Sequence, residues 1–180
     1  VAATPETVKK MIALSYSVSI EAGAGIQASI SDEDYQNNGA DIVSRDQALK
    51  SDLLLMVRPL SEKEITTLKP TQFLVGMLEP FNNELQNLLK KQGVSAFALE
   101  ALPRNTRAQS MDVLSSQANI AGYKAVILAA DYYKKFMPML MTAAGTVKAA
   151  KVIVLGAGVA GLQAVATAKR LGAVVEASDV

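Results

Sequence analysis

Three closely spaced glycines have the pattern of a loop that binds a dinucleotide. The stretch Gly156-Ala157-Gly158-Val159-Ala160-Gly161 fits G-x-G-x-x-G and follows the largely apolar run 151–155. In such a loop the first glycine permits a tight turn, the second lets a diphosphate approach the backbone, and the third lets the following helix pack closely. The N–H groups that begin this helix then face the diphosphate. The pattern predicts dinucleotide contacts from Gly156, Gly158, Val159, Ala160 and Gly161.

An acidic residue follows the glycines where it could select the nucleotide. Asp179 ends a second expected strand, residues 173–177, about 20 residues after the loop. A carboxylate there can accept hydrogen bonds from both ribose hydroxyls of NAD, and it would repel the 2′-phosphate of NADP. Glycine-rich turns also occur in membrane or core helices, but here strand, loop, helix, second strand and acid occur in register. The sequence therefore predicts NAD(H) as cofactor, with Asp179 and the adjacent Val180 in its site.

A second polar cluster precedes the glycine loop in the chain. Its side chains recur at helical steps of three or four: Gln109, Asp112 and Ser115 or Ser116. Such steps would place an amide, a carboxylate and a hydroxyl on one face of a helix, which Arg104 and Arg107 precede or begin. A solvated helix start, with Asp112 paired to Arg107 or to a lysine, is the structural interpretation. A position opposite a nucleotide loop, at the mouth of a cleft between two lobes, favours a functional one.

The composition excludes several kinds of chemistry. The 180 residues include no histidine and no cysteine, which removes disulfides, thiolate nucleophiles, Cys/His metal sites and Ser-His triads. We predict no metal site. The 18 lysines and arginines against 17 aspartates and glutamates leave a net charge of +1, and without a basic run nucleic acid is not an expected partner. No apolar run is long enough to predict a membrane span.

The order of the expected elements predicts an α/β fold of two Rossmann-like lobes joined by a long helix. Thr4-Pro5-Glu6 has the residues of a helix start. Apolar strands are expected at 17–21, 40–43, 53–57, 73–78 and 94–99, and helices at 44–50, 61–68 and 80–92. Such alternation is typical of parallel sheets with helices on both faces. These elements form the first lobe, residues 1–103.

Residues 104–147 are expected to connect the lobes, and residues 148–180 to begin the second. One helix from Thr106 to about Phe136 would span on the order of 45 Å, and Pro138 and residues 142–146 would form a linker. Small residues in that helix would let another element approach its backbone: Ala118, Ala121, Gly122 and Ala125. The second lobe would begin with the strand 151–155, continue with the helix from Leu162 to about Leu171, and reach the strand 173–177.

The chain stops after one β-α-β unit, so the second lobe is expected to be truncated and the natural protein to continue past Val180. We expect this fragment to be inactive alone. We also expect its uncovered strands Val152–Leu155 and Val174–Ala177 to be prone to aggregation.

These stretches together resemble one family closely. Residues 103–126, residues 141–147 and the glycine loop through Asp179 resemble the NAD(H)-binding domain (domain I, alpha subunit) of proton-translocating NAD(P) transhydrogenase. Residues 2–43, with Thr4-Pro5-Glu6 and the stretch Glu21–Gly25, are similar to the start of that domain and of alanine dehydrogenase. The resemblance covers essentially the whole chain. It implies that the first lobe lacks its first strand and its C-terminal return, and that the second half of the domain is missing.

The resemblance implies Re/Si-specific hydride transfer, directly between NADH and NADP+ held on a partner domain. It implies that the catalytic residues at the nicotinamide are Arg104, Gln109, Asp112 and Ser115. Arg104 and Ser115 would orient the carboxamide and ribose, and Gln109 and Asp112 would set the ring conformation and meet the partner domain. Asn105 and Thr106 would also contact NAD(H). Such transfer needs no proton at the reacting carbons, so a chain without histidine or cysteine is adequate.

The resemblance also implies partners. They are the NADP(H)-binding domain and the membrane domain of the same complex, together with a second copy in a homodimer. The chain would be a soluble peripheral domain without direct membrane insertion, on the cytoplasmic face of a bacterial inner membrane or on the mitochondrial matrix side.

Two alternatives from other functional classes remain. An alanine dehydrogenase-like enzyme, as the resemblance implies, uses a lysine and a histidine; here Arg58 stands near the lysine position and Met77 stands where the histidine would be. Without that histidine the oxidation of an amino acid loses its proton carrier, an objection that also applies to saccharopine dehydrogenase-like enzymes. The second alternative is a non-catalytic module that binds NAD for regulation or assembly.

Overall fold

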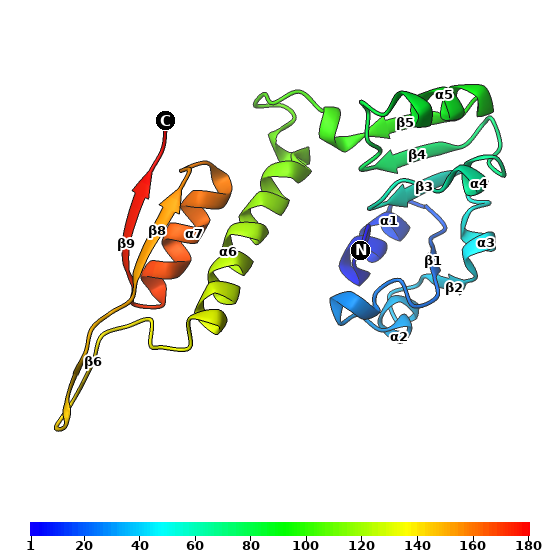
Figure 1. The fold of residues 1–180 in the computed structure, drawn as a ribbon. Helices are drawn as coiled ribbons and strands as arrows, with labels where there is room; N and C mark the ends of the chain where they lie inside the picture. The colour runs from blue at the N-terminus through cyan, green and yellow to red at the C-terminus, as the bar shows by residue number, and fades with distance from the viewer. The chain divides into compact units, whose positions relative to one another are not determined.

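The computed structural model describes residues 1–180, which divide into two compact units, Val1–Met111 and Asp112–Val180. Helices and strands alternate through the first unit (Figure 1). Its elements are α1 (Pro5–Ala13), β1 (Ser19–Glu21), α2 (Asp32–Gln36), β2 (Asp41–Val43), α3 (Arg45–Ala48), β3 (Leu53–Met56), α4 (Glu62–Ile65), β4 (Phe73–Gly76), α5 (Asn83–Gln92) and β5 (Ser95–Ala98). Short 3₁₀ turns lie at Ile26–Ala28, Leu99–Ala101 and Gln109–Met111.

The strands of the first unit pair only in parallel. β1 pairs with β2, and β4 lies between β3 and β5 in a separate sheet. The register places Leu54, Leu74 and Ala96 side by side across that sheet. Parallel neighbours need a crossover connection, which α4 and α5 provide between the three strands. The predicted α/β fold with parallel sheets is therefore confirmed, although the strands are shorter than expected.

Serine side chains fix where the short helices begin. Each accepts a hydrogen bond from the backbone N–H three residues on, and the side chain at that third position accepts one from the serine N–H. These reciprocal capping boxes satisfy two groups that a helix start would otherwise leave unpaired. They occur at three places: Ser31 with Asp34, Ser44 with Gln47, and Ser61 with Glu64. Thr4 caps α1 in a similar way, with Pro5 at its first position.

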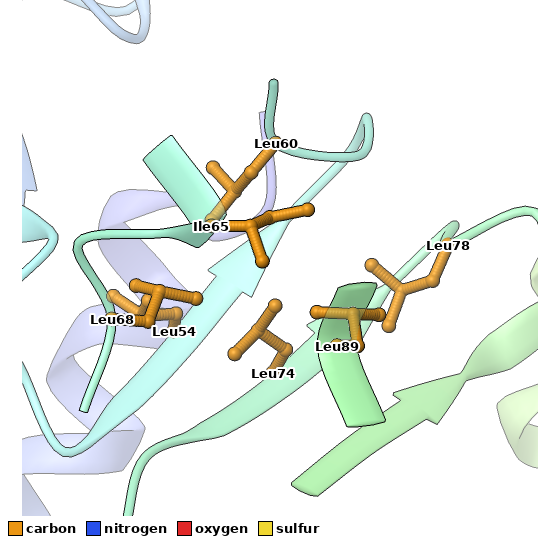
Figure 2. Close-up of a cluster of buried hydrophobic side chains, with 7 residues drawn as sticks. All are labelled: Leu54, Leu60, Ile65, Leu68, Leu74, Leu78 and Leu89. Atoms are coloured by element: carbon orange, nitrogen blue, oxygen red, sulfur yellow. The ribbon is translucent and has the colours of Figure 1, made fainter. Parts of the chain in front are cut away.

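Aliphatic side chains from the sheet and its crossovers form the main core of the first unit. Figure 2 shows seven of them gathered between β3, β4, α4 and α5: Leu54, Leu60, Ile65, Leu68, Leu74, Leu78 and Leu89. A smaller cluster consists of Val8 from α1, Tyr35 from α2 and Ala40, which precedes β2. There the Tyr35 hydroxyl donates to the carbonyl oxygen of Ala3 at 2.8 Å, which ties the start of the chain to α2.

Gln72 is the most deeply buried polar side chain of the first unit, with 2% of its surface exposed. Its Nε2 donates to the carbonyl oxygens of Leu49 at 2.8 Å and Ser51 at 2.6 Å, and its Oε1 accepts from the N–H of Lys69 at 2.6 Å. The amide thereby joins the segment before β3 to the segment before β4. Because a buried polar side chain needs hydrogen-bond partners, these three backbone groups satisfy the amide of Gln72.

Arg45 forms ion pairs with two carboxylates from distant parts of the first unit. Its Nε lies 2.5 Å from Glu64 Oε1, and its Nη1 lies 2.8 Å from Glu21 Oε2. The hydrogen bond from Arg45, followed by those from Ser61, lowers the pKa of Glu64 to about 2. The charged Glu64 carboxylate thus joins α4 to α3, and Arg45 in turn joins α3 to the end of β1 through Glu21.

The second unit begins with a long helix and contains the glycine loop. Its elements are α6 (Val113–Tyr133), β6 (Leu140–Thr142), β7 (Gly145–Val147), β8 (Lys151–Leu155), α7 (Val159–Arg170) and β9 (Val174–Ser178). β8 and β9 pair in parallel, as predicted for a β-α-β unit. α7 begins at Val159, directly at the loop, and not at Leu162. None of the helices combines the length and apolar character needed to cross a membrane.

One expectation for the segment between the lobes is wrong. The long helix begins at Val113 and not at Thr106, because Asn105 accepts the N–H of Ala108 in a tight turn and a 3₁₀ turn follows at Gln109–Met111. The stretch expected as a linker, residues 142–146, lies in an antiparallel hairpin that β6 and β7 form. The hairpin extends away from the rest of its unit (Figure 1).

α6 packs along α7 (Figure 1) through a face on which every fourth residue is at least half-buried. Gly122 and Val126 are buried, and Ala118 and Ala130 are half-buried. A Cβ atom added to Gly122 would lie 2.1 Å from the carbonyl oxygen of Ala160 in α7. The expected close approach of another element is thus confirmed at Gly122.

Replacing Gln72 by leucine is expected to lower the free energy of unfolding by about 2–3 kcal/mol. The leucine would leave the carbonyls of Leu49 and Ser51 and the N–H of Lys69 without this partner. Urea denaturation measures the effect, and Gln36→Leu at an exposed position is the matched control. Equal stability of the two variants would show that the buried amide contributes little.

The Glu64–Arg45 pair predicts a stability difference that depends on pH. A folded-state pKa of about 2, below the ordinary value of 4.5, means that the pair stabilises the fold above the unfolded pKa. Glu64→Gln keeps an acceptor for Ser61, so it should lower stability at pH 7 by about 1 kcal/mol. The difference should shrink below pH 4.5 and be largely lost by about pH 2. The exposed Glu62→Gln serves as the control, and a difference that is as large at pH 2 as at pH 7 would contradict the assignment.

Candidate dinucleotide-binding site

The glycine loop turns sharply from β8 into α7. Gly156 has φ +97°, in the left-handed region that favours glycine, and its N–H donates to the carbonyl of Ser178 in β9 at 2.8 Å. Gly158 stands at the N-cap of α7 without a side-chain cap, so the first turn of the helix presents backbone N–H groups. These groups and the positive end of the helix dipole favour an anion at this point.

The two other glycines of the loop differ in how much room they leave. A Cβ atom on Gly161 would lie 1.8 Å from the carbonyl oxygen of Gly156, so the helix and the loop touch backbone to backbone. A Cβ atom on Gly158 would meet nothing within 4 Å. The loop is therefore closed toward its own helix and open on the side of Gly158. An anionic group could approach the backbone on that open side.

Asp179 closes the loop from the end of β9. Its Oδ2 accepts a hydrogen bond from the N–H of Ala157 at 2.5 Å, and its Oδ1 accepts one from Val180 at 2.7 Å. These bonds, the one from Ala157 first, lower the pKa of the Asp179 carboxyl. The side chain is exposed, so a ligand at the loop can reach it. A charged acceptor thus lies directly beside the glycine turn.

Asp112 and Ser115 lie together at the start of α6. Asp112 is the N-cap: its Oδ1 accepts the Ser115 N–H at 2.9 Å, and its Oδ2 accepts the Ser115 hydroxyl at 2.6 Å. Both residues are half-buried. The pair has the form of a helix cap, a structural role that by itself needs no ligand. It also holds a carboxylate and a hydroxyl in a fixed orientation.

The four residues predicted upstream of this pair, Arg104, Asn105, Thr106 and Gln109, belong to the first unit and are exposed. Asn105 uses its Oδ1 to accept the N–H of Ala108 at 3.0 Å, while Arg104 and Thr106 lie on the surface of the same turn. Gln109 begins the 3₁₀ turn before α6, so the expected single helical face of Gln109, Asp112 and Ser115 does not form. The structure places Asp112 with Ser115, and Asp179 with the glycine loop.

One partner at this site has no counterpart among the residues predicted from sequence. Ala157 fills an unspecified position of the glycine pattern, yet its backbone N–H holds Asp179. A backbone donor has no sequence signature, since any residue other than proline supplies it. The one signal in the sequence for this contact is the position of Asp179 directly after the second strand, which brings its carboxylate near the loop.

Comparison with protein families finds two family models that together match nearly the whole chain. The family described as "Alanine dehydrogenase/PNT, N-terminal domain" matches residues 1–121, and "Alanine dehydrogenase/PNT, C-terminal domain" matches residues 125–180. The boundary between the two matches falls within α6.

Individual relatives fall into the same two groups of enzymes. The chain is 42% identical over 180 aligned residues to NAD(P) transhydrogenase subunit alpha of Haemophilus influenzae, covering 99% of this chain and 35% of that protein. In Rhodospirillum rubrum, the first segment of the NAD(P) transhydrogenase alpha subunit is 48% identical over 188 residues, covering 100% of this chain and 49% of that protein. Alanine dehydrogenase 1 of Staphylococcus aureus is 32% identical over 133 residues, covering 73% of this chain and 35% of that protein.

A solved structure shows the same fold. The crystal structure of transhydrogenase from Sinorhizobium meliloti matches with a TM-score of 0.95 and 50% identity, over 99% of this chain and 54% of that chain. The chain thus spans about half the length or less of the transhydrogenase relatives that it matches.

Proposed function

The chain belongs to the alanine dehydrogenase/PNT family, and from that premise we propose that it is the NAD(H)-binding part of a proton-translocating NAD(P) transhydrogenase. The glycine turn beside Asp179 is the observation that carries this proposal. Gly158 leaves open backbone at the start of α7, and a charged carboxylate stands next to it. These two features fit a diphosphate and an unphosphorylated ribose, which is the combination found in NAD.

The proposal assigns separate tasks to the two polar segments. The backbone of the loop and of the first turn of α7, from Gly156 to Gly161, would hold the diphosphate. Asp179, with Val180 beside it, would hold the ribose of the adenosine. Arg104 and Ser115 would orient the carboxamide and ribose of the nicotinamide, supported by Asn105 and Thr106 in the turn that precedes α6. Gln109 and Asp112 would set the conformation of the ring and meet the partner domain.

The reaction needs little from the protein except position. When bound, NADH would supply a hydrogen with its electron pair from its C4 to C4 of NADP+ on the partner domain, so that NADH would be oxidised and NADP+ reduced. No proton enters or leaves at either carbon, so the absence of histidine and cysteine from the 180 residues is no obstacle. The side chains contribute by aligning the two rings and excluding water.

The rest of the assembly follows from this assignment. NADP(H) would be held by a separate domain, so the chain by itself would be inactive, and a membrane domain of the same complex would translocate protons. We propose Re/Si specificity for the transfer. A homodimer, peripheral to the membrane on its cytoplasmic or matrix side, completes the proposal. Exposed apolar side chains of the second unit offer area for such an interface: Ile120, Leu128, Tyr132 and Met141.

The alanine dehydrogenase alternative is less well supported. Oxidation of an amino acid needs an acid or base near the substrate to carry a proton. Met77, half-buried after β4, has a thioether that cannot carry one, and Arg58, exposed after β3, is not the lysine that the resemblance implies there. The lower identity to alanine dehydrogenase 1, 32% against 48% for the Rhodospirillum rubrum transhydrogenase, points the same way.

One assay on the full-length protein separates the candidate functions. Transhydrogenation predicts that NADPH reduces an NAD analogue only after the NADP-binding domain is added. Consumption of alanine with NAD alone would instead identify an amino-acid dehydrogenase. Tight NADH binding with neither activity would identify a non-catalytic module, and absence of NADH binding would refute all three.

Asp179→Asn is expected to weaken NADH binding by about tenfold or more, because a neutral amide binds ribose hydroxyls less strongly than a carboxylate does. It should also improve NADPH binding at this site relative to NADH, since the repulsion of the 2′-phosphate is lost. Fluorescence titration measures both affinities. Glu176→Gln, an exposed carboxylate of β9, is the control. An unchanged preference for NADH in the Asp179 variant would remove this residue from the ribose site.

A further inference from the structure

We propose that Gly122 is a positioning residue that fixes the diphosphate-binding turn relative to the Asp112–Ser115 pair. The inference rests on the proposed function and deepens it. It adds a residue that touches neither the diphosphate nor the nicotinamide. Gly122 would act because the backbones of α6 and α7 meet there, at the first turn of α7.

The contact at Gly122 involves backbone atoms on both helices. An added Cβ atom would lie 2.1 Å from the carbonyl oxygen of Ala160, 2.9 Å from its carbonyl carbon and 3.1 Å from its Cα. A side chain can rotate away from such an intrusion, but a helical peptide group cannot. A methyl group at position 122 therefore requires α6 and α7 to move apart.

Ala160 lies in the first turn of α7, where the backbone would meet the diphosphate. The next residue, Gly161, is itself in backbone contact with Gly156, where an added Cβ atom would lie 1.8 Å from the carbonyl oxygen. A continuous series of tight backbone contacts thus runs from Gly122 through Ala160 and Gly161 to Gly156. A displacement of Ala160 would reach the glycine turn directly.

α6 carries the nicotinamide-directed pair at its N-terminal end. Ser115 precedes Gly122 by seven residues, which corresponds to about 10 Å along the helix axis. Because the helix is continuous from Val113 to Tyr133, a shift at Gly122 moves Asp112 and Ser115 as well. The contact therefore sets the distance between the turn assigned to the diphosphate and the pair assigned to the nicotinamide end of the coenzyme.

The helix interface holds a larger side chain elsewhere along α6. One turn further along α6, the interface accommodates Val126, which is buried with 5% of its surface exposed. Glycine is thus needed only where α6 passes the first turn of α7. Alanine forms helices more readily than glycine does. If Gly122 made no such contact, replacing it by alanine would therefore stabilise α6.

Gly122→Ala tests the inference in the full-length protein. We expect the Kd for NADH to rise about tenfold or more, because small displacements of aligned groups have large effects. Ala121→Ser adds one atom at the neighbouring exposed position and should bind NADH as the wild type does. Val126→Ala loosens the same interface without pushing on Ala160, so it should lower the melting temperature and leave the Kd nearly unchanged.

The outcomes separate this inference from the proposed function. Wild-type affinity in Gly122→Ala, or an equal loss of affinity in Val126→Ala, would overturn the positioning role alone. Absence of NADH binding in the wild type would overturn the proposed function and this inference together. Should Gly122→Ala fail to fold, hydrogen exchange of the wild type decides: NADH should slow exchange at 118–126 together with 156–162. Protection confined to 156–162 would refute the coupling.

Discussion

The approach of peptide backbones to each other at two glycines, with a third left open, is the constraint on which the candidate site depends. Gly161 lies against the carbonyl of Gly156, and Gly122 lies against the carbonyl of Ala160, at distances that leave no room for a Cβ atom. Gly158 in the same turn is open. The absence of a side chain at Gly161 and Gly122 therefore lets two elements meet, and its absence at Gly158 leaves the backbone accessible. Interiors are packed so densely that such contacts fix position more firmly than flexible side chains can.

Two sources of charge act at this backbone turn, the dipole of α7 and the carboxylate of Asp179. The first turn of α7 favours negative charge, while Asp179 brings a carboxylate to the same turn and satisfies the Ala157 N–H. The diphosphate and the ribose diol proposed to bind here would make opposite electrostatic demands, and a different part of the turn would meet each of them. In the first unit, charged groups have a different role, because Arg45 forms ion pairs with two carboxylates. The leucine-rich core of that unit packs against the sheet.

Much of the fold can be predicted because its signals are local. The apolar strands, the G-x-G-x-x-G spacing and the acid after the second strand all follow from neighbouring residues, and the parallel pairing of β8 and β9 is as expected. The start of α6 is harder to place because its sequence continues to resemble a helix upstream, whereas Asn105 and Asp112 compete for the backbone there. The partner of Gly122 and the three backbone partners of Gln72 depend on tertiary packing, and no spacing in the sequence encodes them.

Isotope transfer tests the central claim most directly. In the full-length protein with its NADP-binding domain, NADH deuterated on the transferred position of C4 should give NADPH that carries the deuterium, with no hydrogen from water at the new C–H bond. That result would show that the two nicotinamides react directly while this scaffold holds them. Solvent hydrogen in the product, or oxidation of NADH that needs no second nucleotide, would contradict direct transfer.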